Sequence, residues 1–312
     1  MSRYLITGGA GFIGSNIARR LLADQQEVRV FDNLSTGRLS NLDDIRNDLD
    51  FAQGDLRDSD ALRRAVEGID YVFHQAAVPS VQRSVENPMG SHLVNSTGTL
   101  DLLIAARDAG VRRVVYAGSS SVYGDSETLP KVETMVPNPI SGYAINKISS
   151  EYYCRIFPAL YGLEAVTLRY FNVFGPYQDP TSEYSAVIPL FVTAYLQGRV
   201  PTIYGDGLQA RDFTYIDNVV DANLLASTAE DASGHAFNIA CGEMISLVDL
   251  ARTIKEIIGA KGEPVHSAPR KGDVRFSLAD ITRAREVLGY EPKVSLREGL
   301  ELTAEFFGAL TP

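Results

Sequence analysis

The sequence predicts an α/β protein with a parallel, doubly wound sheet, and two features of its first half carry this prediction. Short apolar runs alternate with stretches of helical periodicity. The first run leads directly into a glycine-rich turn that opens a helical stretch. Strands that alternate with helices build parallel sheets covered on both faces. The expected strands are Tyr4-Leu5-Ile6, Val28 to Phe31, Tyr71-Val72-Phe73 and Val114-Val115-Tyr116.

The order becomes less regular from about Asn172 onward. Long connections there contain glycine and proline, as ligand-covering loops commonly do. No internal repeat or polar linker separates the two halves, so we expect direct packing and a cleft between them as the site. We therefore expect a first domain over residues 1–171 and a smaller C-terminal α/β domain over 172–312, with some segments returning to the first. The connections are Gly175-Pro176, Asp179-Pro180, Gly205-Asp206-Gly207 and Pro269 to Gly272.

The composition excludes several classes of function. A formal net charge of -10 argues against broad binding of nucleic acid phosphates. No apolar run approaches the length of a membrane span, and the N-terminus enters a strand without the pattern of a signal peptide, so we expect a cytoplasmic protein without a membrane partner. Cys154 and Cys241 stand in no metal-binding pattern, and the 4 His have no zinc-ligand spacing. We expect no metal.

The glycine-rich turn carries the strongest motif. Gly8, Gly11 and Gly14 follow the first strand and open a helix, where glycine permits a tight turn and close approach of a pyrophosphate to free N–H groups. Asp32 ends the second strand, 18 positions after Gly14. A carboxylate there accepts hydrogen bonds from ribose hydroxyls and repels a 2′-phosphate. The pattern therefore predicts a Rossmann-type domain that binds NAD rather than NADP.

Two further segments are weaker candidates for cofactor contacts. Asp55 and Leu56 follow the third strand, where Asp55 could reach an adenine. Ala76 and Ala77 follow the fourth, where small side chains let a flat ring lie close. Turn formation alone explains either pair equally well without the glycine motif.

A tyrosine and a lysine stand four residues apart in Tyr143-Ala144-Ile145-Asn146-Lys147, and therefore share one face of a helix. This spacing recurs often by chance, so its position supplies the argument. It follows the strand Val114 to Tyr116 and the hydroxyl-rich run Ser119-Ser120-Ser121 in the same half that carries the glycine turn.

Together these motifs resemble the extended short-chain dehydrogenase/reductase family, and within it the UDP-hexose 4-epimerases that accept N-acetylated sugars. The resemblance continues through Arg169 to Pro176, Gly205-Asp206-Gly207, Arg211-Asp212-Phe213 and Gly272 to Arg275. It implies Ser119, Tyr143 and Lys147 as catalytic residues. It also implies cofactor contacts at Gly8, Gly11, Phe12, Ile13, Gly14, Asp32, Asn33, Asp55, Leu56, Ala76, Ala77, Asn95, Tyr143, Lys147 and Tyr170.

The chemistry can be stated from the residues. A tyrosine of ordinary pKa is a poor base at neutral pH, but Lys147 and a positive nicotinamide would lower the pKa of Tyr143. Tyr143 would then take the proton of a sugar 4-hydroxyl while hydride leaves carbon 4, and Ser119 would share the developing charge. Hydride return to the other face of the 4-keto sugar inverts the centre without net oxidation.

Substrate contacts follow from the resemblance, and two arginines among them suit a pyrophosphate. Surface ion pairs remain the alternative for Arg211 and Arg270. Ser277 aligns with a position where glucose-restricted epimerases carry a bulky tyrosine, so we expect UDP-N-acetylglucosamine and UDP-N-acetylgalactosamine, with UDP-glucose and UDP-galactose as further candidates. The expected substrate contacts are Ser119, Ser120, Ser121, Tyr143, Asn172, Val187, Arg211, Phe213, Arg270, Asp273 and Ser277.

Three other functions stay open. A UDP-glucuronate 4-epimerase would need donors for the sugar carboxylate, which the sequence does not position. A 4,6-dehydratase commonly carries an acid just after the catalytic hydroxyl, where this chain has Ser120, Ser121 and Val122. A non-catalytic NAD-binding protein would have lost one of the three catalytic residues. The family resemblance also suggests a homodimer through long helices over 93–109 and 143–161, although packing within one subunit explains their apolar residues too.

Overall fold

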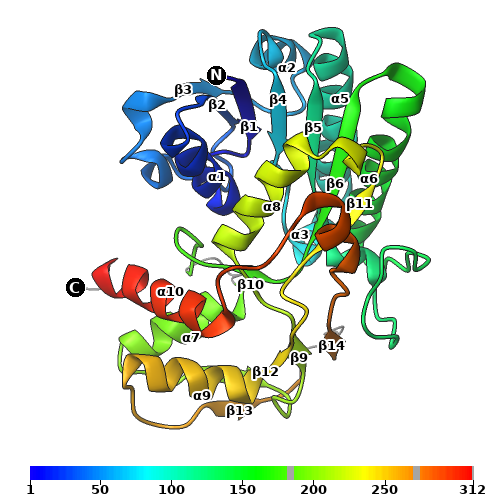
Figure 1. Ribbon diagram of the computed structural model, residues 1–312. Helices are drawn as coiled ribbons and strands as arrows, with labels where there is room; N and C mark the ends of the chain where they lie inside the picture. Colours follow the sequence, from blue (N-terminus) through cyan, green and yellow to red (C-terminus); the bar gives the residue numbers. More distant parts are fainter. Residues whose placement is uncertain (181–185, 270–274, 311–312) are drawn as a thin grey trace.

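A seven-stranded parallel sheet forms the centre of the computed structural model, which describes residues 1–180, 186–269 and 275–310 (Figure 1). The strand order is β11-β6-β5-β4-β1-β2-β3, and every neighbouring pair is parallel. This confirms the predicted doubly wound sheet. The strands are β1 (Arg3–Thr7), β2 (Glu27–Asp32), β3 (Asp50–Gln53), β4 (Tyr71–His74), β5 (Arg113–Ser119), β6 (Glu164–Tyr170) and β11 (Ala236–Ile239).

Helices cover both faces of this sheet because its strands are apolar on both sides. In β1, Tyr4 and Ile6 join one buried cluster while Leu5 joins the other. Burial of each such side chain contributes about 1.5 to 3 kcal/mol. Helices α1 (Phe12–Ala23) and α8 (Ile216–Thr228) pack on one face, and α2 (Ser59–Val66), α5 (Gly98–Asp108) and α6 (Gly142–Tyr161) on the other.

The helix expected over 93–109 is present with a widened first turn. A π-helical turn, η3 (Leu93–Thr97), leads directly into α5, and the short helices α3 (Val81–Glu86) and α4 (Pro88–His92) precede it. The carbonyl of Asn95 accepts hydrogen bonds from the hydroxyls of Thr99 and Ser150, both at 2.7 Å. These bonds compete with the regular helical ladder, which accounts for the wider turn.

The second half of the chain forms a smaller lobe below the sheet in Figure 1. Its helices α7 (Val187–Leu196), α9 (Leu247–Ile258) and α10 (Leu296–Leu310) pack against one another. Strand β11 and helix α8 instead return to the sheet. The short strands of this half are β7 (Val173–Phe174), β8 (Thr202–Tyr204), β9 (Ala210–Arg211), β10 (Thr214–Tyr215), β12 (Ile245–Ser246), β13 (Val265–Ser267) and β14 (Phe276–Ser277).

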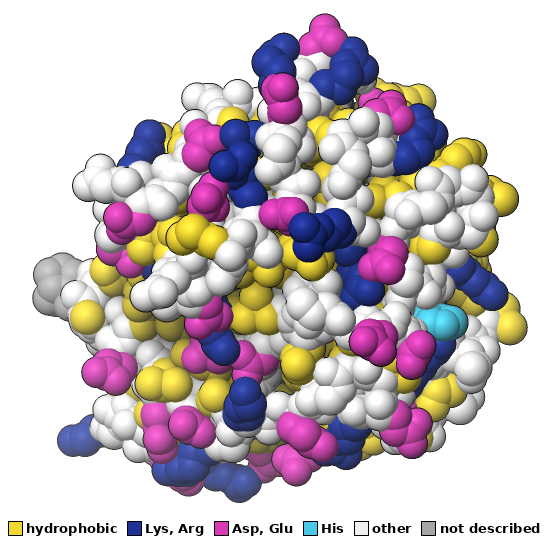
Figure 2. Space-filling model, turned by 45° about the horizontal axis from the view of Figure 1, so that its top comes forward, with side chains coloured by type: hydrophobic (Ala, Val, Ile, Leu, Met, Phe, Trp, Pro, Cys, Tyr) yellow, Lys and Arg dark blue, Asp and Glu magenta, His cyan; other side chains and the backbone are white. Residues whose placement is uncertain are grey.

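Acidic and basic side chains are interspersed on the face of the molecule drawn in Figure 2. A surface of mixed sign differs from the continuous basic face that broad phosphate binding needs. None of the helices in the described part of the chain combines the length and hydrophobicity of a bilayer-spanning segment.

A buried ion pair joins the long helix α6 to the sheet. The guanidinium of Arg169 on β6 donates from Nε to Glu151 Oε2 at 2.9 Å and from Nη2 to Oε1 at 2.5 Å. The two side chains are only 4% and 7% exposed. Arg169 also donates to the hydroxyl of Tyr123 at 2.7 Å, so the pair has the additional hydrogen bonds that a buried charge requires.

We expect Arg169→Met to lower the free energy of unfolding by about 3 to 5 kcal/mol, because the change leaves Glu151 as an uncompensated buried charge. Urea unfolding followed by circular dichroism measures this loss. The matched control is Arg285→Met, which removes an exposed pair with Glu291 and should cost less than about 1 kcal/mol. Equal losses in the two variants would contradict this description of the pair.

Candidate functional site

The glycine-rich turn brings two backbone segments closer together than side chains allow. Gly8 has a φ of 69°, and a Cβ there would lie 2.7 Å from the backbone of Ala76. A Cβ on Gly14 would lie 2.4 Å from the carbonyl oxygen of Gly8. Helix α1 begins directly after Gly11, so its first N–H groups point out of the turn. The turn is therefore built to receive an anionic group.

Asp32 lies at the carboxyl end of β2, beside this turn. Its Oδ2 accepts a hydrogen bond from the Ala10 backbone N–H at 3.0 Å, and its Oδ1 accepts one from Leu34 at 2.7 Å. Burial raises the pKa of this carboxyl, and the two N–H donors oppose the rise. The carboxylate is thus held in one orientation at the edge of the cavity described next.

A cavity of about 1230 Å³ follows the carboxyl ends of β1 to β4, where the strand order reverses. Such a reversal is the usual ligand site in open α/β sheets. The expected cofactor residues that line it are Gly8, Gly11, Phe12, Ile13, Gly14, Asp32, Asn33, Asp55, Leu56, Ala76 and Ala77.

Four expected cofactor residues, Asn95, Tyr143, Lys147 and Tyr170, do not belong to the lining of this cavity among the described residues. The amide of Asn95 pairs with the backbone N–H and carbonyl of Val78 at 2.7 and 3.2 Å, so it supports a lining segment from behind. The buried hydroxyl of Tyr170 is hydrogen-bonded by Gln75 and Asn223. Direct cofactor contacts of these four residues remain predictions.

Two of the lining segments were not among the expected cofactor contacts: one lies within residues 34–44, and the other is residues 177–180, of which Asp179-Pro180 was expected in a ligand-covering connection. The first follows Asp32 with Ser35-Thr36-Gly37, a small and hydroxyl-rich run that could have signalled a phosphate-binding loop. The second begins just after Gly175-Pro176, which we had expected only as part of a ligand-covering connection. Contacts between segments far apart in the sequence bring both to the cavity, so their place in its lining could not be read from local patterns alone.

Asp55 is oriented by its neighbours. Its carboxylate accepts hydrogen bonds from the Arg57 guanidinium at 2.8 and 2.7 Å and from the Asn33 amide at 2.8 Å. Arg57, the larger cause, and Asn33 together hold the pKa of Asp55 well below its usual range. The carboxylate therefore stays charged at the cavity wall at every physiological pH.

The three expected catalytic residues come together where α6 packs on β5. Ser141 caps the helix by accepting from the Ala144 backbone N–H at 3.1 Å, which places Tyr143 in the first turn. The Ser119 hydroxyl, at the end of β5, lies close enough to Tyr143 to affect the pKa of its phenol. The Nζ atom of Lys147 lies 5.7 Å from the centre of the Tyr143 ring and donates to the Ala117 carbonyl at 2.8 Å.

The protein alone does not lower the pKa of Tyr143, so the lowering expected from Lys147 together with a bound nicotinamide stays a prediction. Burial raises the pKa of this phenol, while the hydrogen bond from Ser119 opposes the rise. Burial also lowers the pKa of Lys147 to about 8, because the interior disfavours its positive charge. A lower pKa for Tyr143 therefore depends on a positive charge that a bound cofactor brings.

A second cavity, of about 610 Å³, lies in the smaller lobe. The guanidinium of Arg211 is held by the carbonyls of Ala210 and Arg275 at 3.0 and 3.1 Å. Arg270 and Asp273, two more expected substrate contacts, lie outside the described residues. The expected substrate residues that line this cavity are Asn172, Val187, Arg211 and Phe213.

Ser277 is paired with Arg211, although it does not belong to the lining of either cavity. The two residues face each other in the parallel pair β14 and β9. Asp212, which the sequence suggested only as part of a motif, joins β9 to two other segments through its buried carboxylate. Its buried carboxylate accepts from the backbone N–H groups of Cys241 at 2.9 Å, Gly242 at 3.0 Å and Ala279 at 3.3 Å.

Ser120 and Ser121 follow Ser119 in a short turn, η4 (Ser120–Tyr123). The Ser121 backbone N–H donates to the Ser119 hydroxyl oxygen at 3.2 Å. The buried hydroxyl of Ser121 has no hydrogen-bond partner among the described residues. The turn thus fixes the Ser119 hydroxyl through the Ser121 backbone.

Known proteins resemble this chain along its whole length. Residues 4–240 match the NAD dependent epimerase/dehydratase family. A UDP-glucose 4-epimerase of Mycolicibacterium smegmatis is 43% identical over 309 residues, which are 98% of each protein. The structure of a UDP-glucose 4-epimerase with UDP-glucose from Thermotoga maritima has a TM-score of 0.95 and 41% identity, and covers 99% of this chain and 100% of that one. A UDP-N-acetylglucosamine 4-epimerase from Methanobrevibacter ruminantium, in complex with UDP-N-acetylmuramic acid, has a TM-score of 0.95 and 37% identity, and covers 99% of each chain.

In protein freed of dinucleotide, we expect the phenol of Tyr143 to ionise above its ordinary pKa of about 10. Burial opposes the phenolate, and Lys147, with a pKa of about 8, has already lost its charge at that pH. Oxidised dinucleotide should lower this pKa. The difference in ultraviolet absorbance between the wild type and Tyr143→Phe isolates the phenol during titration. Ionisation below pH 10 without dinucleotide would contradict the electrostatic argument.

Proposed function

Because this chain belongs to the NAD dependent epimerase/dehydratase family, we propose that it inverts the 4-hydroxyl of a UDP-hexose. We propose UDP-N-acetylglucosamine and UDP-N-acetylgalactosamine as its main substrates, with UDP-glucose and UDP-galactose also accepted. One observation carries the proposal: Ser119, Tyr143 and Lys147 come together where α6 packs on the end of β5. Ser119 faces Tyr170 across the sheet, two residues before Asn172 in the second cavity. The full-length 4-epimerase relatives support the same reaction.

The residues of the first cavity fit NAD. The glycine turn and the start of α1 suit its pyrophosphate, and Asp32 suits the adenosine ribose hydroxyls while disfavouring a 2′-phosphate. Lys147 is 3% exposed, and its ammonium has one hydrogen-bond acceptor among the described residues, although it carries three donors. Hydroxyls of the nicotinamide ribose would satisfy the other two, so we assign Lys147 to that contact.

Each catalytic side chain has a separate task. Tyr143 takes the proton from the sugar 4-hydroxyl as the base. Ser119, beside Tyr143, donates to the same sugar oxygen and stabilises its developing charge. Lys147 favours the phenolate of Tyr143 through its positive charge. When bound, NAD accepts the hydride from carbon 4 and gives it back.

The reaction balances without an external oxidant. The sugar loses a proton and a hydride and becomes a 4-keto sugar. Tyr143 keeps the proton and returns it to the same oxygen when hydride returns to the opposite face of carbon 4. Inversion therefore requires the keto sugar to turn over in the site while the UDP group stays anchored.

We assign the UDP group to the second cavity. Arg211 there provides a guanidinium, the side chain best suited to the oxygens of a diphosphate, and the acidic protein needs such local positive charge. Asn172 has a φ of 34°, an uncommon backbone conformation that commonly marks a functional position. Its amide donates to the Asp212 carbonyl at 2.8 Å, which joins the catalytic edge to the UDP cavity.

Ser277 is our proposed determinant of sugar size. Its pairing with Arg211 puts it next to the proposed diphosphate ligand. Two residues after Ser277, the backbone N–H of Ala279 donates to the Asp212 carboxylate. A serine there leaves room for a 2-acetamido group that a tyrosine would fill.

Proton NMR of the enzyme with UDP-N-acetylglucosamine, UDP-glucose or UDP-glucuronate, each with stoichiometric NAD, tests these assignments. We expect the galacto epimers of the first two.

We expect Ser277→Tyr to lower turnover of the N-acetylated sugar by about 10-fold or more and to spare UDP-glucose, because only the acetamido group meets the new ring. Ser277→Ala is the control and should retain both activities. Equal turnover of both sugars by wild type and Ser277→Tyr would contradict the size gate, and turnover of UDP-glucuronate alone would contradict the substrate assignment.

We also propose that two copies of the chain associate through α5 and α6. Helix α6 presents five large apolar side chains to solvent, and Ile104 on α5 is 37% exposed. A second copy of this face would cover them, as in a four-helix bundle. The five side chains are Ile145, Tyr152, Ile156, Leu160 and Tyr161, which are between 42% and 63% exposed.

Sedimentation velocity at micromolar concentration should show a dimer that Ile156→Glu converts to monomer, because the change buries a charge in the proposed interface. Leu302→Glu is the matched control: it has similar exposure, 38% against 42%, but lies on α10. A monomeric wild type, or equal dissociation in both variants, would exclude this interface.

We propose the cytoplasm as the location of the enzyme. Both cysteines are free thiols, and Cys154 is buried in α6. Free thiols are typical of reducing compartments, and the proposed substrates are soluble nucleotide sugars.

A further inference from the structure

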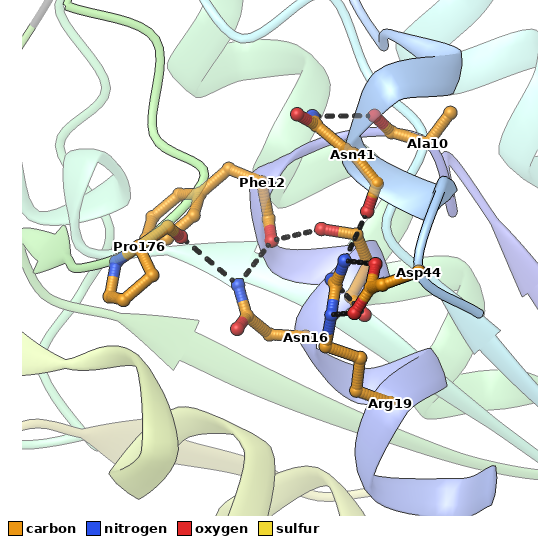
Figure 3. A network of polar contacts seen from close by, with 8 residues as sticks. Ala10, Phe12, Asn16, Arg19, Asn41, Asp44 and Pro176 are labelled. Atoms are coloured by element: carbon orange, nitrogen blue, oxygen red, sulfur yellow. Dashed lines mark hydrogen bonds and ion pairs between the residues drawn. The ribbon is translucent and has the colours of Figure 1, made fainter. Parts of the chain in front are cut away.

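Loop residues 176–180 contact the glycine-rich helix α1, although the two segments are far apart in the chain (Figure 3). The loop enters from the smaller lobe after β7, whereas α1 belongs to the sheet. Residues 177–180 line the first cavity together with residues 34–38, Asn41 and Asp44. The contact therefore joins three walls of the proposed NAD site.

Arg19 on α1 is the centre of this contact. Its guanidinium donates to the Asp44 carboxylate, including one bond of 2.9 Å from Nε, and to the carbonyls of Asn41 at 2.6 Å and Ser15 at 3.1 Å (Figure 3). One face of the guanidinium lies over the Tyr177 ring, 3.8 Å from its centre. The Arg19 side chain is 19% exposed and that of Asp44 is 55% exposed, so the guanidinium is largely shielded from water while the carboxylate is not.

Tyr177 is held in an unfavourable backbone conformation by this packing. Its φ is 68°, in the left-handed region that residues other than glycine seldom adopt. Its ring lies between Arg19 and the ring of Phe306 on α10, with 4.8 Å between the two ring centres. A strained residue fixed from both sides points to a functional requirement for its position.

Two amides extend the contact to the glycine turn itself. The Nδ2 atom of Asn16 donates to the carbonyls of Phe12 at 2.9 Å and Pro176 at 3.2 Å (Figure 3). The Nδ2 atom of Asn41 donates to the Ala10 carbonyl at 2.9 Å. Displacement of loop 176–180 would therefore break bonds to the segment that receives the pyrophosphate.

We propose that Arg19 is a positioning residue that retains NAD, because it locks loop 176–180 of the smaller lobe onto the walls of the dinucleotide cavity. Arg19 does not belong to the lining of that cavity among the described residues, so it acts through Tyr177, Asn41 and Asp44. The inference rests on the assignment of NAD to this cavity. It is independent of which sugar the enzyme uses. A lock of this kind suits an enzyme whose NAD is regenerated in every cycle and need not leave.

The test is the dissociation rate of NAD, measured by loading the protein with isotopically labelled NAD and chasing it with excess unlabelled NAD in the absence of sugar. We expect Arg19→Met to release NAD at least about tenfold faster than the wild type, the factor that corresponds to about 1.4 kcal/mol. Arg20→Met is the matched control, because the neighbouring Arg20 bonds only Asp24 and Asp221 among the described residues. It should leave the rate unchanged.

A second pair of variants guards against a general loss of structure. Tyr177→Leu removes the ring that Arg19 covers and should also accelerate release, whereas Tyr177→Phe keeps the ring and should not. Thermal unfolding without NAD identifies variants that are merely destabilised. Unchanged release from both Arg19→Met and Tyr177→Leu, or equal acceleration by Arg20→Met, would overturn the proposal.

These outcomes separate the two proposals. A wild type that binds no NAD would overturn this inference together with the proposed function. A wild type that binds NAD but epimerises no UDP-sugar would refute the proposed function alone, because release of NAD is measured without a sugar.

Discussion

The buried ammonium of Lys147 is the constraint on which the catalytic site depends. Its bond to the Ala117 carbonyl ties α6 to β5 two residues before Ser119, so the first turn of the helix brings Tyr143 to the Ser119 hydroxyl. Burial of a cation is costly, and it lowers the pKa of Lys147 to about 8. The protein tolerates this cost beside Tyr143. A second positive charge there, that of an oxidised nicotinamide, would stabilise the Tyr143 phenolate.

The topology of the sheet brings the remaining groups to that position. All seven strands are parallel, so the glycine turn after β1, Asp32 after β2 and Ser119 on β5 share one edge. The chain leaves this edge after β6 and reaches the second cavity within a few residues, at Asn172. Loop 176–180 then turns back onto α1. One short stretch of chain therefore borders both proposed ligand sites, which suits a sugar that must stay anchored while its ring turns over.

Local patterns were enough to predict the sheet, the glycine turn and the catalytic helix, because each depends on residues close in sequence. Eleven of the expected cofactor residues line the first cavity. The connection with Asp179-Pro180 was expected to cover a ligand, but its contact with Arg19 was not predictable, since that contact depends on packing between distant segments. The raising of the Tyr143 pKa by burial was not predictable, because desolvation depends on the burial of the whole helix; the lowering expected from Lys147 with a bound nicotinamide stays a prediction. The buried amide of Asn95 and the buried hydroxyl of Tyr170 are bound by protein groups far away in the sequence. No short motif could have predicted these bonds.

The central claim is that the hydride removed from carbon 4 returns to the same carbon of the same sugar. The most direct measurement is mass spectrometry with NMR on UDP-N-acetylglucosamine carrying deuterium at carbon 4, incubated to equilibrium with the enzyme in ordinary water. The account predicts that both epimers keep the deuterium at carbon 4, because hydride transferred to a nicotinamide does not exchange with solvent. Replacement of the deuterium by solvent hydrogen during inversion would contradict hydride transfer and require a different mechanism.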